Sequence, residues 1–249
     1  DGPWAAAARR YIPRMSASDT LGEPRELTAF WRWSGRLGWV LLVLMLGPFV
    51  LYSAMQGIGG LDGDLPADNR FLKPDAAASN LSIFVHMITG AVITFLAPFQ
   101  LVGYLRRRWP GLHRLSGRVL VATALVTAIG GLGFIFIRGT EGGWIMDVGA
   151  FGYGACVLVC AVETLRHARA GRFARHREWA LRLFVLAIAS WIYRMHYVLW
   201  YLATDGLWSN EDFTGAFDLV TIFAFYIPYL ILIEIYIRAT RPRPIAQAV

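Results

Sequence analysis

The sequence has few of the residues and motifs on which soluble active sites depend. It has two cysteines, Cys156 and Cys160, whose spacing of four fits neither a CxxC redox motif nor a zinc-ligand pair, and we interpret them as small buried hydrophobes. There is no P-loop, no HExxH, no Gly-x-Ser-x-Gly and no acidic metal cluster. No cleavable signal peptide is recognisable, so we expect the first apolar run to serve as an uncleaved anchor. The sequence therefore gives no support to a soluble-type active site.

The composition indicates lipid as the solvent. Hydrophobic residues make up 56% of the sequence and aromatic residues 14%, and the mean hydropathy is +0.46, all above soluble averages. The net charge of +7 would also suit a nucleic-acid-binding protein. However, the arginines cluster between apolar runs, and no basic recognition helix or aromatic RNA-binding surface is present. Membrane topology explains the basic charge better, and we expect no nucleic-acid partner.

Six apolar runs have the length that a helix needs to cross a bilayer core about 30 Å thick. We predict an all-α, polytopic membrane bundle with six transmembrane helices at about 37–55, 81–104, 119–137, 146–165, 179–201 and 217–237. The predicted domains are a cytoplasmic N-terminal segment, 1–36, a membrane domain, 37–238, and a cytoplasmic tail, 239–249. Glu26 to Arg36 either forms a helix on the inner membrane surface or extends the first span. We expect kinks at Pro48, Pro98 and Pro228.

The basic residues predict the orientation of the spans. Of the 24 lysines and arginines, Arg70, Lys73 and Arg138 fall in connections on one side and Arg194 falls inside a span. All the others lie in the N-terminal segment, the second and fourth connections and the tail. Because Lys and Arg stay on the cytoplasmic side during insertion, both termini are predicted to be cytoplasmic. We expect a multi-pass protein of the bacterial inner membrane, in contact with the lipid bilayer.

Two histidines lie at matched depth within predicted spans. His86 and His196 are each about 9 Å from the middle of their spans, towards the outer side. Gly90, one turn below His86, leaves room for a flat ligand. The pair suits axial ligation of the iron of a b-type haem, or a quinone pocket. The alternative is a pair of histidines that are hydrogen-bonded within the bundle.

Charged side chains inside a bilayer cost several kcal/mol unless they are paired or solvated. We expect Arg194 to pair with Asp147 or Asp218, which begin spans on the outer side. Such a pair is either a structural clasp or part of a proton path. On the inner side the same reasoning applies to Arg182, with Glu163 and Glu234 at similar depth.

Two inner connections carry similar motifs. The segment from His113 to Arg118 (HRLSGR) resembles the segment from His176 to Arg182 (HREWALR), which suggests a weak internal repeat. Each places a histidine and two arginines at the inner interface, where they can bind an anionic lipid head group, a quinone head or a haem propionate. The alternative is that the arginines only anchor the inner side.

Four blocks of sequence carry a family resemblance. They are HMITG at 86–90, LAPFQ at 96–100, the basic segment from Arg106 that leads to His113 and Gly117-Arg118, and HREW at 176–179. They resemble the signature of a bacterial family of multi-pass predicted membrane proteins, domain-of-unknown-function family 2306, over roughly half the chain, about Asn80 to Tyr201. The resemblance implies a helical membrane core without an assigned activity.

A looser similarity concerns haem. His86 with Gly90, and His113 with Gly117, resemble the His-x-x-x-Gly of four-helix b-type cytochromes. Two-haem members of that class place paired histidines about four turns apart on one helix, whereas His176 and His196 are about 30 Å apart. The similarity therefore favours a single haem between His86 and His196.

Two functions follow as hypotheses. The first is electron transfer with a b-type haem or a quinone site. The alternative is a non-catalytic accessory or scaffold subunit of a larger respiratory or photosynthetic membrane complex. A transporter is not indicated, because the outer connections are short and no repeat of long broken helices is present.

Overall fold

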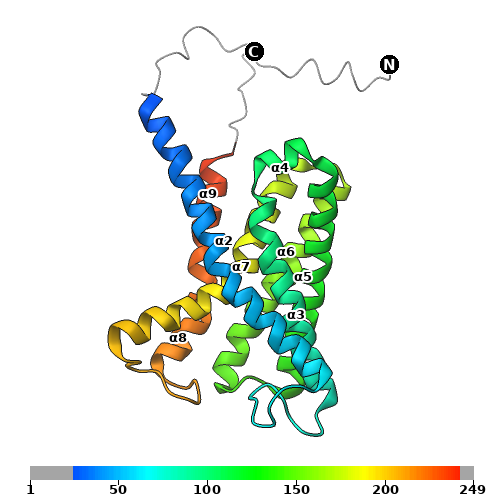
Figure 1. Ribbon diagram of the computed structural model, residues 1–249, viewed down its shortest axis with the longest axis vertical. Coiled ribbons are helices and arrows are strands. Elements are labelled where there is room, and N and C mark those ends of the chain that lie inside the picture. Colours follow the sequence, from blue (N-terminus) through cyan, green and yellow to red (C-terminus); the bar gives the residue numbers. More distant parts are fainter. Residues whose placement is uncertain (1–24, 242–249) are drawn as a thin grey trace, which may run out of the picture. The chain divides into compact units, whose positions relative to one another are not determined.

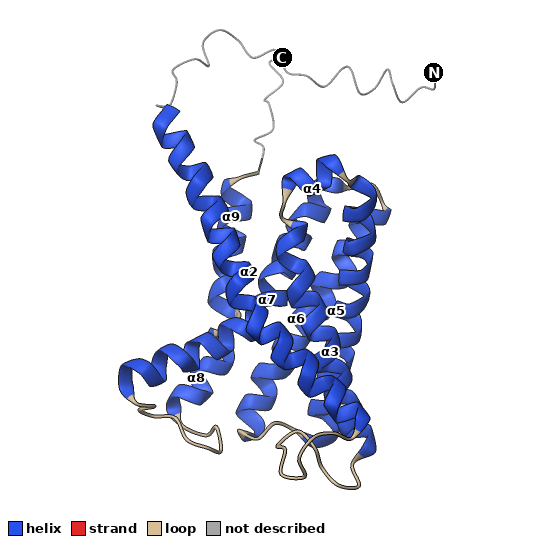
Figure 2. Cartoon of the chain, viewed as in Figure 1, coloured by secondary structure: helices blue, strands red, loops and turns tan. Residues whose placement is uncertain are grey.

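The computed structural model describes residues 25–241, and the regular structure in that range is entirely α-helical (Figures 1 and 2). The helices are α2 (Arg25–Asp62), α3 (Ala77–Gln100), α4 (Gly103–Arg108), α5 (Pro110–Arg138), α6 (Gly143–Arg169), α7 (Phe173–Thr204), α8 (Ala216–Ala224) and α9 (Ile227–Ala239). Six segments are long and apolar enough to cross a membrane: one in each of α2, α3, α5, α6 and α7, and one formed by α8 and α9 together. The predicted all-α bundle with six spans is confirmed.

Two of the predicted spans differ from the helices near a proline. The second span ends early, because α3 stops at Gln100, two residues after Pro98, and α4 then begins at Gly103. The sixth span is interrupted by a turn at Phe225 and Tyr226, and Pro228 lies in the first turn of α9. Proline has no N–H to donate, so a first turn tolerates it. Pro48, in contrast, remains inside the continuous helix α2.

The chain divides into two units, residues 1–41 and residues 42–249. In the first unit the helix begins at Arg25 and includes Glu26 to Arg36, so this segment is continuous in helix with the first span. The rest of the predicted N-terminal segment, and residues 242–249 of the predicted tail, lie outside the described residues. The domain limits at 36 and 238 stay predictions.

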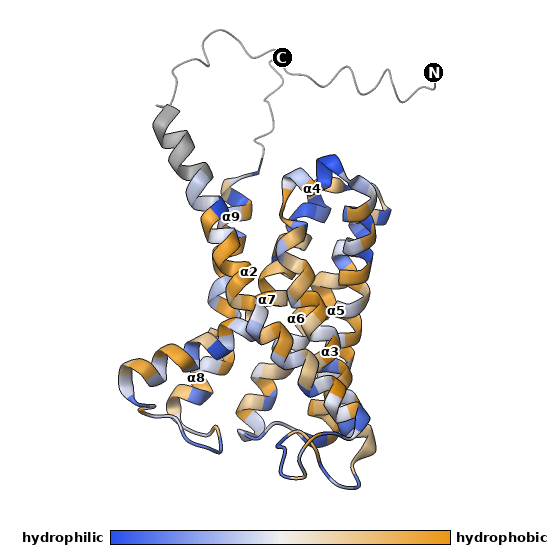
Figure 3. Cartoon of the chain, in the orientation of Figure 1, coloured by the Kyte–Doolittle hydropathy of each residue, from blue (hydrophilic) through white to orange (hydrophobic). Residues whose placement is uncertain are grey.

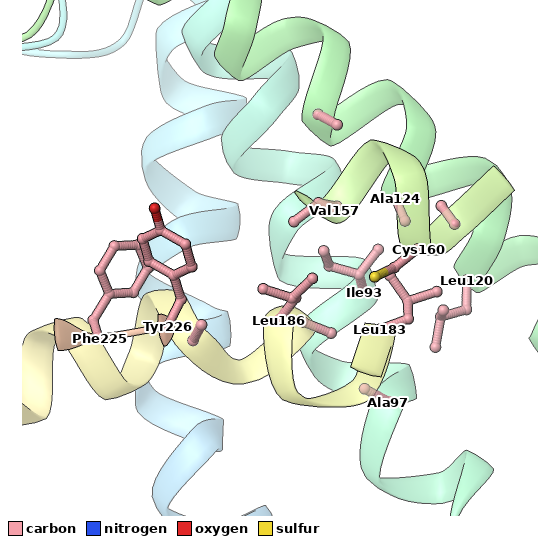
Figure 4. Packing of buried hydrophobic residues seen from close by; sticks show 14 of the residues in the cluster. Ile93, Ala97, Leu120, Ala124, Val157, Cys160, Leu183, Leu186, Phe225 and Tyr226 are labelled. Atoms are coloured by element: carbon pink, nitrogen blue, oxygen red, sulfur yellow. The ribbon is translucent and has the colours of Figure 1, made fainter. Parts of the chain in front are cut away.

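Four helices of the second unit enclose the main core. α3 packs beside α5, α5 beside α6, α6 beside α7, and α7 back against α3. Alanine and other small or aliphatic side chains fill the space between them, as membrane helix interfaces require. Figure 4 shows Cys160 among Ile93, Leu120 and Leu183. Both cysteines are free. Cys160 is buried, which confirms its interpretation as a small buried hydrophobe, whereas Cys156 is only partly buried and packs against the core.

The polar residues gather at the ends of these helices. Figure 3 shows mainly apolar residues along the middle of the bundle and hydrophilic residues at α4 and in the connections. α4 and the α6–α7 turn lie at one end of the bundle, and the α2–α3 connection lies at the other (Figure 1). The two inner connections with similar motifs are therefore on the same side.

Candidate functional site

His86 is held on the side of α3 that faces α5. Its Nδ1 lies 2.8 Å from the carbonyl oxygen of Thr127. Because a carbonyl oxygen only accepts, Nδ1 carries the proton and Nε2 keeps the lone pair. The ring also lies against Gly131, where an added Cβ would be 2.8 Å from Nδ1. Gly90 faces the same helix, since its Cβ would meet the methyl group of Thr127 at 3.8 Å.

His196 faces a different helix. Its Nε2 lies 3.0 Å from the hydroxyl oxygen of Tyr229, and the two rings are stacked with centroids 6.0 Å apart. His86 therefore contacts α5, whereas His196 contacts α9. Both histidines have hydrogen bonds within the bundle, as the second interpretation of the pair expected.

Arg194 has no carboxylate partner among the described residues. Its Nη1 donates to the carbonyl oxygen of Ser190 at 2.9 Å and to Ser190 Oγ at 3.1 Å. Its guanidinium carbon lies 4.7 Å from the ring centroid of Phe49. The two expected partners are engaged elsewhere: Asp147 accepts from the Thr140 N–H, and Asp218 accepts from residues of the α7–α8 connection and from Tyr197.

The charge of Arg194 acts on several phenol groups and on one imidazole. Arg194 interacts electrostatically with Tyr52, Tyr153 and Tyr193, and also with His86. These side chains come from α2, α6, α7 and α3. We call Arg194, His86, Tyr52, Tyr153 and Tyr193 the arginine cluster.

A second polar group lies at the other end of the bundle. His176 Nδ1 is 3.0 Å from the carbonyl oxygen of Thr164, and His113 interacts electrostatically with His176. Within the described structure, Thr164 Oγ1 and His167 Nδ1 are buried and have no hydrogen-bond partner. The two signature histidines thus lie at the same end of the bundle (Figure 1) and interact electrostatically, although they are 63 positions apart in sequence.

Sequence reasoning missed Thr164 and His167. Both lie on the buried stripe of α6 that also carries Val157 and Ala161, with spacings of three and four residues. That helical periodicity was the available signal, because a polar residue on an apolar stripe points into the bundle.

The inner ion pairs agree in part with expectation. Arg182 donates to Glu234, whose other oxygen accepts from Arg238, and Arg182 also lies 4.7 Å from the Trp179 ring centroid. Glu163 pairs instead with Arg166 and His167 on its own helix.

The comparison with family models identifies the chain. A model described as "Predicted membrane protein (DUF2306)" matches residues 83–237, more than half of the sequence. The chain belongs to this family. All six predicted site residues lie within the DUF2306 segment: His86, Gly90, His113, His176, Arg194 and His196. No curated protein and no solved structure matches the chain.

The apolar bundle thus holds two polar groups, and of their residues only Tyr52 lies outside the DUF2306 segment. The arginine cluster contains a cation, phenol groups and an imidazole whose Nε2 keeps a lone pair. The Tyr153 hydroxyl donates to the carbonyl oxygen of Leu186, and the Tyr193 hydroxyl lies 3.2 Å from that of Tyr197. Among the side chains that the structure describes, residues 33–241, no three of His, Cys, Asp or Glu come together in a group that could hold a metal ion.

Proposed function

We propose that the protein binds the head group of a quinone at the arginine cluster and takes part in membrane electron transfer. The observation that carries this proposal is Arg194, a cation inside a membrane span with no carboxylate partner in the described part of the chain. A charged side chain in that position costs several kcal/mol unless other groups compensate it.

The hydrogen bonds of Arg194 leave donors for a ligand. Only Nη1 has a bond to the described residues, so Nε and Nη2 remain available to an acceptor. A quinone carbonyl oxygen is such an acceptor, and it becomes more negative as the ring is reduced, which strengthens its interaction with a fixed cation. Phe49 and the tyrosines add aromatic surface suited to a flat ring.

The redox step involves a second protein. Reduction of a quinone to a quinol consumes two electrons and two protons, and we assign the electron supply to a separate membrane redox protein. The residues of this chain bind and orient the quinone, and they keep its carbonyl oxygen beside a positive charge. Oxidation of quinol at the same site reverses these transfers.

The geometry favours a quinone over a haem. Axial ligation by two histidines requires a nitrogen lone pair from each at one iron. His86 offers Nε2, but the Nε2 of His196 is hydrogen-bonded to Tyr229 of α9. We therefore derive no step through haem. A reduced-minus-oxidised absorption spectrum with a b-type Soret band would contradict this choice.

Titration of the purified protein with decylubiquinone and with a short-chain menaquinone, followed by tryptophan fluorescence, tests the proposal. We expect saturable quenching by one of them, and a loss of affinity of at least tenfold in Arg194→Gln. Arg194→Lys keeps the charge and should retain part of the affinity. Arg182→Gln, which removes a paired arginine of the same helix, is the matched control and should bind as the original chain does.

Two results would overturn the proposal. One is the absence of saturable binding of either quinone to the unaltered chain. The other is equal affinity in Arg194→Gln and Arg182→Gln. Circular dichroism and gel filtration of each variant establish that it is folded. If Arg194→Gln is not folded, the affinity of Arg194→Lys is compared with that of Arg182→Gln instead.

An accessory role in a larger respiratory or photosynthetic complex is the alternative. Leu44, Leu51, Met55 and Ile58 are exposed and form one stripe of α2, the kind of surface that packs against lipid or against a helix of another subunit. Co-purification with a large assembly in mild detergent, together with no quinone binding, would favour this role. Either function suits the bacterial inner membrane.

A further inference from the structure

The corner between α4 and α5 concentrates positive charge without compensation. Its arginines are exposed, and none has an ion pair within the described structure: Arg106, Arg107, Arg108, Arg114 and Arg118. The sequence contains no aspartate or glutamate between residues 76 and 140. No acidic side chain of the same hairpin can neutralise this corner.

The neighbouring corner at the same end is different. Around the α6–α7 turn, Glu163 pairs with Arg166, and Glu178 pairs with Arg175 and Arg241. Arg169, Arg172 and Arg177 have no such pair in the residues described. Anchoring on the cytoplasmic side requires arginines, but these arginines can be paired with carboxylates. A group of arginines without any such pair, as at the α4–α5 corner, is therefore not explained by anchoring alone.

The same corner carries interfacial aromatic and apolar surface. Tyr104 and Trp109 are exposed and meet edge to face, with ring centroids 6.3 Å apart. A shallow cleft of about 520 Å³ is lined by Arg108, Trp109, Pro110, Gly111 and Leu112. Leu112 and Leu115 are exposed on the first turns of α5. Along the chain, arginine is followed by tryptophan and then by leucine. These side chains suit, in the same order, the phosphate, the glycerol and the acyl chain of a phospholipid.

We propose that the α4–α5 corner binds the phosphate head group of an anionic phospholipid of the cytoplasmic leaflet. Guanidinium groups hold phosphate oxygens with paired hydrogen bonds, and the exposed Trp109 next to Arg108 is the side-chain type that prefers the membrane interface. The cleft holds the head group against the start of α5. This site is separate from the arginine cluster, so the quinone proposal and this one stand or fall independently.

Lipid retention in nanodiscs tests the proposal. The protein is reconstituted in phosphatidylcholine with 20% phosphatidylglycerol, and the lipid that stays bound after detergent extraction is counted by native mass spectrometry. We expect retention of phosphatidylglycerol to fall at least fivefold in the triple variant Arg106→Gln, Arg107→Gln, Arg108→Gln. The matched control is Arg169→Gln, Arg172→Gln, Arg177→Gln, which removes the same charge from the other corner and should retain the lipid.

Further measurements distinguish a specific lipid site from binding by the overall positive charge of the surface. Trp109→Ala changes no charge and should also lower retention, which serves as the test if the triple variant does not fold. Equal loss in the two triple variants would overturn the proposal, because a diffuse surface potential would then explain the binding. Saturation by soluble glycerol phosphate, with phosphatidylglycerol no better, would overturn it as well, since the ligand would be a free phosphate rather than a lipid.

Discussion

Asp218 is a buried carboxylate that is surrounded by hydrogen-bond donors. It is fully buried, and both of its oxygens accept hydrogen bonds. Oδ1 accepts from the hydroxyls of Tyr197 and Ser209 at 2.8 and 2.7 Å, and Oδ2 accepts from the backbone N–H groups of Asn210 and Gly215 at 3.2 and 3.1 Å. Every partner is a donor, so the site is complementary to a carboxylate rather than an amide.

We predict that Asp218→Asn destabilises the protein by about 2 kcal/mol. The amide keeps one accepting oxygen but turns an NH2 towards donors, so buried donors lose their acceptor. The thermal midpoint in detergent measures the effect. Asp205→Asn is the control, because Asp205 is exposed in the same connection and has a left-handed backbone (φ 55°), which asparagine tolerates. Equal midpoints for the two variants would contradict the prediction.

At the scale of helices, glycine sets the approach of α5 to α3. A Cβ at Gly130 would lie 2.9 Å from the carbonyl oxygen of Ser82, a backbone atom that cannot give way alone. A Cβ at Gly133, one turn further on, would meet Ser82 Oγ at 3.5 Å, an ordinary contact. A side chain at Gly130 would therefore collide with the backbone of α3 beside His86, whereas one at Gly133 would not.

Gly130→Ala and Gly133→Ala form a matched pair within one helix. Alanine favours helix over glycine by up to about 1 kcal/mol, so Gly133→Ala should be neutral or slightly stabilising. In Gly130→Ala, overpacking should outweigh that gain and destabilise the protein by roughly 1–3 kcal/mol. Unfolding by a denaturing detergent compares the two free energies. A destabilised Gly133→Ala beside an unaffected Gly130→Ala would show that the helix contact is elsewhere.

Arg182 and Glu234 join α7 to α9 near the inner end. We expect a double-mutant cycle with Arg182→Gln and Glu234→Gln to give a coupling of about 1 kcal/mol, the size found for polar contacts between membrane helices. Glu234→Gln also removes the pair with exposed Arg238. The single variant Arg238→Gln measures that contribution, which should be a few tenths of a kcal/mol. A coupling free energy near zero between Arg182 and Glu234 would mean that this ion pair adds no stability.

The sequence predicted elements better than contacts between them. Hydropathy gave the six spans because a long apolar run has few alternatives to a membrane helix. It did not give the partners of His86 and His196, since these depend on how each helix is rotated: His86 turns to Thr127 and His196 to Tyr229. The partners expected for Arg194 failed for a related reason. The oxygens of Asp218 already accept from Tyr197 and from its own connection, and Asp147 accepts from the Thr140 N–H.

At the scale of the whole molecule, the position of the basic connections predicts the orientation of the protein in the membrane. The α4–α5 corner and the α6–α7 turn lie at one end of the bundle, and the α2–α3 connection lies at the other (Figure 1). An even number of spans places both termini on the same side. Because Lys and Arg stay on the cytoplasmic side during insertion, the end with the basic connections is predicted to be cytoplasmic. The phospholipid proposal depends on this orientation, whereas the packing of the core does not.

Cysteine labelling tests this orientation directly. In a background with Cys156→Ala and Cys160→Ala, single cysteines replace four exposed residues: Asp68, Arg107, Arg172 and Glu211. A maleimide that does not cross membranes should label positions 68 and 211 in intact cells, and positions 107 and 172 only after permeabilisation. Labelling of all four in the reverse pattern would keep the six spans but invert the protein. If positions 107 and 172 reacted from opposite sides, an odd number of crossings would separate them, which is incompatible with α5 and α6 both spanning the membrane.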